Sequence, residues 1–410
     1  MKKTICLNMI VKNESHIIER TLENLLKYIS FSYWVISDTG STDNTKEVIT
    51  SFFKKKRIDG ELVEHAWKDF GYNRSKALEC AYGKSDYVFI FDADDSIVDN
   101  FVLPNPLVFD KYNFKFGKGF SYVRPLLVNN KKRWCFKGVL HESLANMEPL
   151  DQGEITIDGD YYIDSGRLGN RSKNPNKYYD DAIVLKNAFS TEFSTDYPMA
   201  CRYAFYCAQS YKDAGEKYID DSIEWYEKCL TLHNWDQEKY YSCLMLGELY
   251  NKKKDSINAV KYWLQSINYD QERIEGIVLA MNFFNANKQY LLVSLLFHKY
   301  KNYQKTFPKN DKLFLFETLY QYDMELLFLS CSHFLKEFDE GYSCCKYVLF
   351  NQTADKDKTK MAISNMLMYK DNLMRETNLL VFEKVNDMLA TFEETHPSLS
   401  EVWNILFANY

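Results

Sequence analysis

Three carboxylates within four positions follow a short apolar run in the N-terminal quarter of the chain. The run is Tyr87 to Phe91, and the acids are Asp92, Asp94 and Asp95. Such a run is typical of a buried strand in a parallel sheet, and ligands of open α/β sheets bind outside the carboxyl ends of these strands. Neighbouring acids repel one another unless a cation is close, and carboxylate oxygens suit Mg²⁺ or Mn²⁺. The spacing therefore predicts a divalent metal site, while an acidic, solvated turn remains the alternative for this motif alone.

Further polar groups follow the other predicted strands. They are Lys12, Asn13 and Glu14 after the first strand, Asp38 after the second, and His141 and Glu142 at the end of a later extended segment. Between them, the helix start at Asn73 and Arg74 offers backbone N–H groups and a cation to an anion. Taken singly, each group has a simpler explanation, such as a turn, a helix cap or a half-buried histidine. Taken together, they are the parts of a nucleotide-sugar site.

The elements that position these groups alternate between strand and helix. Apolar patterns predict strands at 4–11, 33–37, 61–65 and 87–91, and helices at 16–28, at about 43–55 with Ser41 or Thr42 as its cap, and at 73–82. This alternation predicts a doubly wound α/β domain with a parallel sheet. The segments 120–128 and 134–140 then predict an antiparallel hairpin, followed by short strands at 155–157 and 161–163. Residues 166–176 have the composition of a linker.

From about residue 178 the sequence predicts helices to the end of the chain. Residues 203–211 resemble 241–250, and their following segments 222–226 and 259–263 resemble each other too. A looser third pair covers 275–286 and 290–300. Paired helices that recur in this way predict a solenoid of helical hairpins, similar to tetratricopeptide repeats. We interpret their many aromatic residues as core rather than as a sugar-binding surface.

Bulk properties exclude several classes of protein. The chain has 410 residues, enough for two or three domains. Its net charge of −6 argues against a general binder of nucleic acid. No apolar run reaches the roughly 18 to 20 residues that cross a bilayer, and the N-terminus is a poor signal peptide. The ten cysteines have no zinc-like spacing, which indicates reduced thiols in a cytoplasmic protein.

The ordered motifs resemble those of family 2 glycosyltransferases with the GT-A fold. The motifs are residues 11–14, 38–43, 73–74 and 91–95, and Trp134 with residues 138–142. More narrowly, the chain resembles the branch in which tetratricopeptide-like helices follow this domain. The resemblance implies a GT-A domain, Rossmann-like and α/β, over residues 1–175 and an all-α helical-repeat domain over 176–410. The implied reaction is metal-dependent transfer, with inversion, from a UDP-sugar of the glucose or N-acetylglucosamine type to a hydroxyl or similar group.

The resemblance also implies roles for single residues. Asp38 would bind the base, usually uridine, in a pocket lined by Val11 and Asn13, with Glu14 beside it. The remaining nucleotide-sugar contacts would come from Asn73, Arg74, Asp92, Arg171 and Lys173, whereas we interpret Arg167 as a solvated charge. The Mn²⁺ or Mg²⁺ ligands would be Asp94, His141 and, through its water shell, Asp92. The base that deprotonates the acceptor would be Glu142 or Asp95, of which we prefer Glu142.

Two other classes of function compete with this hypothesis. In the first, the chain is a protein-interaction scaffold with a catalytically degenerate domain, but its acid cluster, Asp38 and His141-Glu142 are all intact. In the second, it is a nucleotidyltransferase, which would need a Gly- and Arg/Lys-rich loop after the first strand that residues 11–15 do not provide. The acceptor remains open among proteins, glycans and lipid-linked groups. The helices predict acceptor binding or a homodimer.

Overall fold

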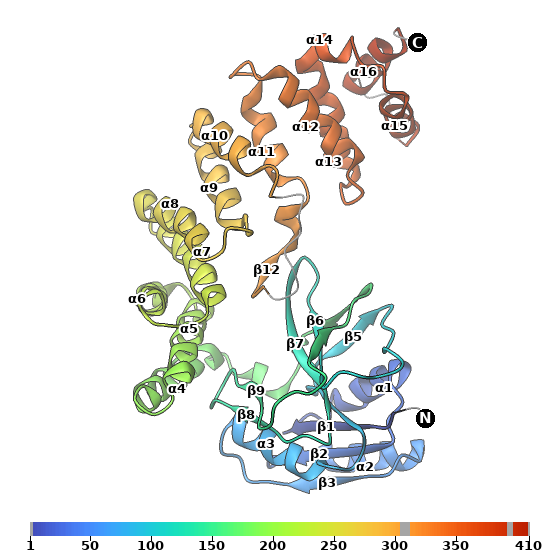
Figure 1. Ribbon diagram of the computed structural model, residues 1–410, viewed down its shortest axis with the longest axis vertical. Coiled ribbons are helices and arrows are strands. Elements are labelled where there is room, and N and C mark those ends of the chain that lie inside the picture. Colours follow the sequence, from blue (N-terminus) through green and yellow to red (C-terminus); the bar gives the residue numbers. More distant parts are fainter. Residues whose placement is uncertain (1–2, 304–311, 392–396, 409–410) are drawn as a thin grey trace. The chain divides into compact units, whose positions relative to one another are not determined.

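The chain packs into two compact units, shown in Figure 1. The computed structural model describes residues 3–303, 312–391 and 397–408. The first unit comprises residues 1–242 with 310–315, and the second comprises residues 243–309 with 316–410. The expected fold class, an α/β domain followed by helices, is confirmed. The predicted boundary at 175/176 coincides with the start of the helices, although the first unit extends well beyond it.

A mixed sheet forms the centre of the first unit. Its strands are β1 (Ile5–Val11), β2 (Tyr33–Asp38), β3 (Gly60–Glu64), β4 (Tyr87–Ile90), β5 (Ser96–Asp99), β6 (Lys111–Phe116), β7 (Phe120–Asn129), β10 (Glu154–Thr156) and β11 (Tyr161–Asp164). Among the described residues their main order is β3-β2-β1-β4-β7-β6-β11-β5. The first four neighbours are parallel, and β7 runs antiparallel to β4 and β6. The carboxyl ends of β1, β2 and β4 therefore meet at one edge.

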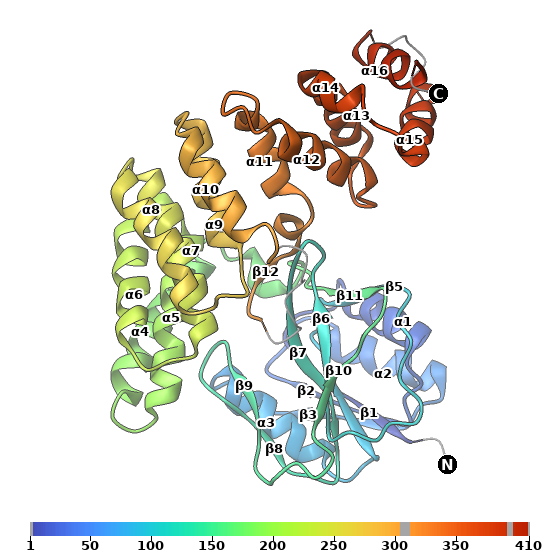
Figure 2. The ribbon, with the colours of Figure 1, turned by 45° about the horizontal axis from the view of Figure 1, so that its top comes forward.

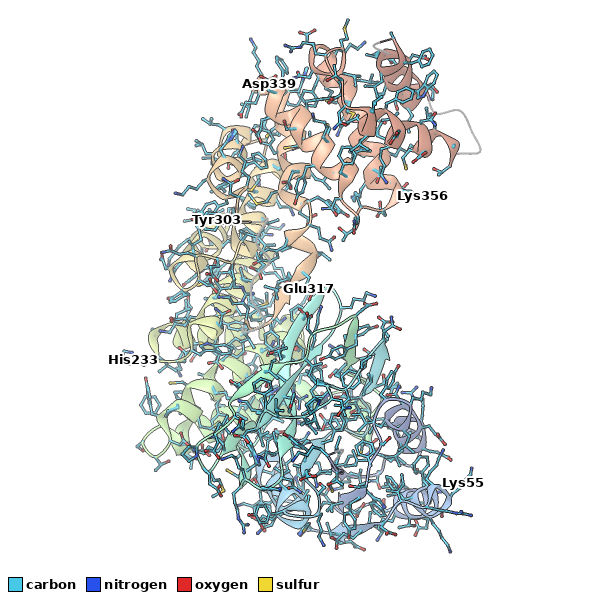
Figure 3. All side chains as sticks on the ribbon, turned by 45° about the vertical axis from the view of Figure 1, so that its right-hand side comes forward. Lys55, His233, Tyr303, Glu317, Asp339 and Lys356 are labelled. Carbon is cyan, nitrogen blue, oxygen red and sulfur yellow. The ribbon has the colours of Figure 1, made fainter. Side chains whose placement is uncertain are left out.

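Helices cover both faces of the parallel part of this sheet (Figure 2). Alternate β1 residues such as Leu7 and Met9 face a core shared with α1 (Ile18–Tyr28) and α2 (Thr45–Lys56). The intervening Cys6 faces a smaller core beneath α3 (Phe70–Ala81). At the end of α2, Lys55 points outward (Figure 3), where a cation complements the negative end of the helix dipole.

The predicted hairpin of 120–128 with 134–140 is wrong. The hairpin partner of β7 is β6, which the sequence analysis missed, and the two join through a turn in which Gly117 and Gly119 have φ of 75° and 80°. β8 (Trp134–Lys137) pairs instead with β9 (Ser143–Asn146) in a separate two-stranded sheet. Gly138, with φ of 107°, ends β8. The residues before His141 therefore form a turn rather than a returning strand.

The predicted cap of α2 is wrong, and α3 begins before its expected start at Asn73. Ser41 Oγ accepts from the Asn13 amide at 2.9 Å, and Asp43 Oδ1 accepts from the Thr45 amide at 3.1 Å at the start of α2. α3 begins at Phe70 and its cap is Asp69, whose Oδ1 accepts from the Tyr72 amide at 2.7 Å. Ser41 and Thr42, the residues expected to cap α2, instead bind Asn13 in the loop after β1.

Helices continue from residue 177 through both units. They are α4 (Lys177–Glu192), α5 (Tyr197–Ala214), α6 (Ile219–Thr231), α7 (Asp236–Lys252), α8 (Ser256–Gln265), α9 (Glu275–Ala286), α10 (Tyr290–Tyr300), α11 (Asp323–Ser332), α12 (Phe338–Phe350), α13 (Lys356–Asn365), α14 (Lys370–Leu373), α15 (Leu379–Ala390) and α16 (Pro397–Phe407), with a short β12 (Leu315–Phe316). The self-similar segments fall on equivalent helices, α5 with α7 and α6 with α8. The tetratricopeptide-like character of these hairpins stays a prediction.

Two further observations concern the whole described chain. None of the helices in residues 3–303, 312–391 and 397–408 combines the length and apolar composition needed to cross a membrane. None of the ten cysteines, which all lie within the described residues, forms a disulfide bond, and for several of them, such as Cys229, burial raises the pKa of the thiol above its ordinary value.

Candidate active site

The loops after β1 and β2 are tied together at the sheet edge. Val11 lies opposite Asp38 in the parallel register, and the Thr39 amide donates to the Val11 carbonyl at 2.9 Å. Asn13 adopts a φ of 60°, and its Oδ1 accepts from the Thr42 amide at 2.7 Å. The structure thus brings together Val11, Asn13 and Asp38, as the sequence predicts.

Asp38 is a buried carboxylate with one oxygen unused. Its side chain lies in a residue that is only 1% exposed, and its Oδ2 accepts from the Gly40 and Ser41 amides at 3.0 and 2.9 Å. Its Oδ1 is buried and has no hydrogen-bond partner within the described part of the chain. A buried acceptor without a donor is unfavourable by roughly 1–3 kcal/mol. Asp38 is therefore prepared to accept one hydrogen bond from a bound molecule.

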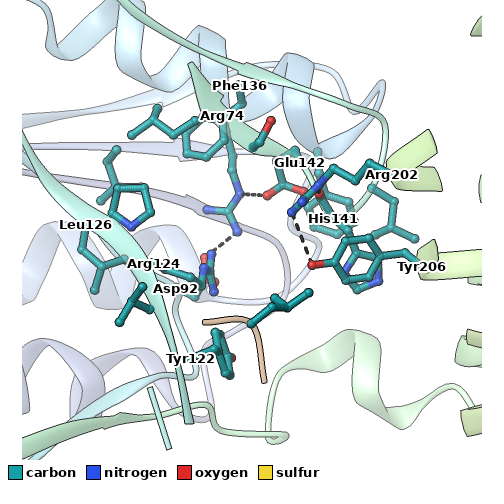
Figure 4. A pocket seen from close by; sticks show the side chains of 18 of the residues that line it. Arg74, Asp92, Tyr122, Arg124, Leu126, Phe136, His141, Glu142, Arg202 and Tyr206 are labelled. Atoms are coloured by element: carbon teal, nitrogen blue, oxygen red, sulfur yellow. Dashed lines mark hydrogen bonds and ion pairs between the residues drawn. The ribbon is translucent and has the colours of Figure 1, made fainter. Parts of the chain in front are cut away.

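Arg74 joins the acidic motif to the turn that carries Glu142 (Figure 4). Its Nη2 donates to Asp92 Oδ1 at 2.5 Å, and its Nε donates to Glu142 Oε1 at 2.6 Å. Burial alone would lower the pKa of Arg74, but the two carboxylates raise it above its ordinary value. Asp92 has a second cation, Arg124 of β7, at 3.6 Å. Burial opposes ionisation of Asp92, yet Arg74 and Arg124 lower its pKa below the usual range.

These groups line a cavity of about 570 Å³ within the first unit. We call it the arginine-lined pocket because its walls carry Arg74, Arg124, Arg171 and Arg202 beside Asp92, His141 and Glu142. Arg202 and its neighbour Tyr206 belong to α5, so the first helical hairpin supplies part of the wall. The pocket holds more cationic than anionic side chains, which favours an anionic ligand.

His141 occupies a constrained position at the wall formed by α5. It has a φ of 52°, and its ring stacks on Tyr206 with centroids 4.1 Å apart and planes 7° apart. Arg202 Nε donates to the His141 carbonyl at 2.9 Å. The surrounding protein and then the charges of Arg202, Arg171 and Arg124 lower the pKa of His141 to about 3. The imidazole is therefore neutral at physiological pH.

The two candidate bases have different surroundings. Glu142 lines the arginine-lined pocket, with a side chain 8% exposed and Oε1 held by Arg74. Asp95 is buried and is absent from the pocket wall. Burial and then the Asp92 carboxylate raise the pKa of Asp95 well above its usual value. Because Glu142 lines the pocket and Asp95 does not, Glu142 is better placed to contact a substrate.

The interpretation of residues 166–176 as a linker is wrong, because this segment folds onto the acidic motif. The Gly169 amide donates to Asp94 Oδ2 at 3.2 Å, and the Asn170 amide donates to both Glu14 carboxylate oxygens at 3.2 Å. A Cβ on Gly166 would stand 1.8 Å from the Asp94 carbonyl oxygen, so only glycine permits this approach. Burial and the Asp94 charge raise the pKa of Glu14 to about 7. We call residues 166–173 the glycine-containing loop.

Of three further residues predicted to contact the nucleotide-sugar, Arg171 and Lys173 lie near the site and Asn73 does not. Arg171 lies in η1 (Asn170–Lys173), lines the pocket, and is anchored to α4 by an ion pair with Asp181. Lys173 is close enough to lower the pKa of Glu14. Asn73 is not brought to the pocket. It is fully buried in α3, where its side chain accepts from the Lys68 amide at 2.9 Å and donates to the Ala66 carbonyl at 3.0 Å.

The predicted metal set of Asp92, Asp94 and His141 does not assemble as one group. Among the described residues there is no cluster of three or more His, Cys, Asp or Glu side chains that could hold a metal. Asp92 is neutralised by two arginines, and His141 stacks on Tyr206. Asp94 fits a cation better, because burial and then Asp92 raise its pKa, and a bound cation would offset both effects. One carboxylate together with phosphate oxygens is a common way to hold Mg²⁺.

Sequence reasoning missed Arg124, Arg202 and Tyr206 as site residues. Arg124 was part of a predicted strand, but nothing local indicates which strand it would face. Arg202 and Tyr206 are spaced i, i+4 on one helix, and the Arg202 guanidinium lies 4.7 Å from the Tyr206 ring centroid. That spacing was visible, yet the approach of α5 to His141 is a tertiary feature.

Comparison with known proteins gives a family match in the N-terminal part of the chain. Residues 6–112 match the family described as Glycosyl transferase family 2, and no curated protein matches the sequence. The chain is similar to residues 1–349 of S. aureus TarS in complex with UDP-GlcNAc, with 13% identity and a TM-score of 0.30, covering 65% of this chain and 91% of that chain. It is also similar to mannosyltransferase PcManGT from Pyrobaculum calidifontis in complex with GDP-Man and Mn²⁺, with 12% identity and a TM-score of 0.32, covering 65% and 88%. The family match includes Asp38, Arg74 and the acidic motif.

Proposed function

We propose that this chain is a glycosyltransferase with the GT-A fold whose donor is a UDP-sugar, on the premise that its residues 6–112 match glycosyl transferase family 2. The observation that carries the choice of nucleotide is the unpartnered, buried Oδ1 of Asp38. Uracil presents a single N3–H donor to such an oxygen. Guanine would present two adjacent donors, but Oδ2 is already occupied by the Gly40 and Ser41 amides. One free oxygen therefore fits uracil better than guanine.

We further propose direct displacement with inversion, using Glu142 as the base. Glu142 is held by Arg74 through Oε1, which leaves Oε2 for the acceptor hydroxyl. Arg74 lies beside Asp92 and faces the departing diphosphate, where its guanidinium offsets developing negative charge. Asp95 is the alternative base, and its burial away from the pocket makes it the weaker candidate.

A divalent cation, Mn²⁺ or Mg²⁺, is part of this proposal. Asp94 would hold it together with the phosphate oxygens of the donor. When bound, such an ion stabilises the charge of the leaving nucleoside diphosphate as a Lewis acid. The transferred sugar is proposed to be of the glucose or N-acetylglucosamine type, and a cytoplasmic location remains a prediction. The alternative, an interaction scaffold with a degenerate domain, gives no reason for a buried carboxylate that lacks a donor.

Calorimetric titration of UDP, GDP and TDP with Mn²⁺ tests the proposed donor. We expect UDP, and TDP whose base carries the same N3–H, to bind more tightly than GDP. Asp38→Ala should weaken UDP by roughly tenfold to a hundredfold, since a hydrogen bond to a charged group contributes about 1.5–3 kcal/mol. Asp43→Ala provides a control, because both carboxylate oxygens of Asp43 already accept hydrogen bonds, from Ser15 and Thr45. Equal binding of UDP and GDP, or no effect of Asp38→Ala, would refute the assignment.

A further inference from the structure

Arg202 is a cation on the helical wall of the arginine-lined pocket, and its counter-ion Glu238 is buried. Arg202 faces the pocket, while its carboxylate partner Glu238 is 4% exposed and its Oε1 lies 3.5 Å from Arg202 Nη1. Arg202 also donates from Nη2 to Tyr206 Oη at 3.4 Å. Both distances are long for such bonds. The guanidinium has five N–H groups, so it retains donors for a ligand.

A second cation comes from the opposite wall. The Arg124 side chain is 36% exposed and packs over the Phe116 ring, with its guanidinium 5.0 Å from the centroid. Its ion-pair distance to Asp92 is 3.6 Å, and Asp92 is held more closely by Arg74. The charges of Arg202 and Arg124 both reach His141, whose pKa they lower. The pocket as a whole therefore keeps a positive potential that is only partly neutralised.

The position of Glu142 separates two sides of the pocket. In Figure 4, Glu142 and His141 lie between Arg74 and Arg202, and each arginine contacts one of them. In a direct displacement the acceptor attacks from the side opposite the leaving group. With Glu142 at the attacking hydroxyl and Arg74 at the departing diphosphate, Arg202 lies on the side from which the acceptor enters. An anion bound by Arg202 is then part of the acceptor, distinct from the donor phosphates.

Resting on the proposed transferase function, we propose that Arg202 of α5 binds an oxyanion, a phosphate or a carboxylate, carried by the acceptor. A guanidinium presents two parallel N–H groups that match either oxyanion. Trp235 also lines this pocket and is 50% exposed, so its ring offers an apolar face to the rest of the acceptor. The acceptor is an anionic molecule, and the first helical hairpin selects it.

A purely structural role for Arg202 makes a different prediction. If Arg202 only holds the His141 carbonyl in place, its loss disturbs every acceptor equally. If it binds an acceptor anion, its loss weakens charged acceptors alone. Three probes that share one sugar ring separate these cases: glucose 6-phosphate, glucuronate and glucose.

The test is calorimetric titration of these probes into the protein saturated with UDP and Mn²⁺. We expect one of the two charged probes to bind at least tenfold more tightly than glucose. If that probe is glucose 6-phosphate the site takes a phosphate, and if it is glucuronate the site takes a carboxylate. Arg202→Gln should weaken that probe by roughly tenfold or more and leave glucose unchanged, since a charge-assisted pair is lost. Arg202→Lys, which keeps the charge, should restore part of the affinity.

Arg375→Gln is the matched control, because the exposed Arg375 donates its Nε to the Asp371 carbonyl in the second unit. It should bind all probes as the natural protein does. The proposal is overturned if glucose binds as well as both charged probes, if no probe binds, or if Arg202→Gln weakens all three equally. Affinity for UDP is measured first. Failure to bind UDP refutes the proposed donor, whereas the probes titrated without UDP still test the oxyanion site.

Discussion

Replacing Arg74 by methionine should destabilise the first unit more than the loss of a surface ion pair would. Arg74 is 9% exposed and lies between Asp92 and Glu142, with N···O distances of 2.5 and 2.6 Å. Removing one member of a buried pair costs about 3–5 kcal/mol, because the remaining charge has no partner. Asp92 is 24% exposed and keeps Arg124 at 3.6 Å, so the loss of Arg74 destabilises Asp92 less than it destabilises Glu142. We expect a loss of about 2–4 kcal/mol in the free energy of unfolding, mostly from the Glu142 carboxylate.

A double-mutant cycle with Glu142→Gln isolates this contribution. Neutralising Glu142 in the Arg74→Met background should recover about 1–2 kcal/mol, as expected for residues in contact. Urea unfolding, followed by fluorescence and fitted with separate transitions for the two units, measures these values. Lys76→Met is the control, since Lys76 pairs with Glu79 on the exposed face of the same helix at 2.7 Å and should cost less than about 1 kcal/mol. Equal losses for Arg74→Met and Lys76→Met, or additive effects in the cycle, would contradict this account.

Three further predictions follow from the same site. The pKa of Glu14 is raised to about 7, so its stabilising contribution is complete below its unfolded pKa near 4.3 and is lost as pH rises through 7. In EDTA, the natural protein should therefore lose about 1–2 kcal/mol of unfolding free energy between pH 5 and 8 that Glu14→Gln does not lose, after allowance for solvent screening; identical pH profiles would contradict this. Glu142→Gln should keep UDP affinity and lower transfer by roughly 10²–10⁴-fold, and an active Glu142→Gln beside an inactive Asp95→Asn would move the base to Asp95. Gly166→Ala should push the glycine-containing loop away from the Asp94 carbonyl, because the new Cβ would stand 1.8 Å from it. Faster hydrogen exchange in residues 166–173 would register that shift, and unchanged exchange would show that the close approach is dispensable.

Local patterns identified the parallel half of the domain well. The strands β1 to β4 and the helices α1 to α3 fall within a few residues of their predicted ranges, because a buried parallel strand is a continuous apolar run and an amphipathic helix repeats every 3.6 residues. Patterns missed β6, gave β8 the wrong partner, and indicated a linker where the loop after β11 folds onto the acidic motif. β6 alternates polar and apolar side chains, and the partner of such a strand depends on which distant segment it meets.

The sequence by itself determined which groups lie at the sheet edge. Parallel strands carry the residues at their carboxyl ends to one side, so Asp38 and the acidic motif had to converge there. Only the tertiary structure decided how these groups are paired. It placed Arg124 and Arg74 on Asp92, folded the supposed linker onto Asp94, and brought Arg202 to His141. The physical reason is that ion pairs and loop contacts depend on side chains that are remote in sequence and become neighbours only when the core has packed.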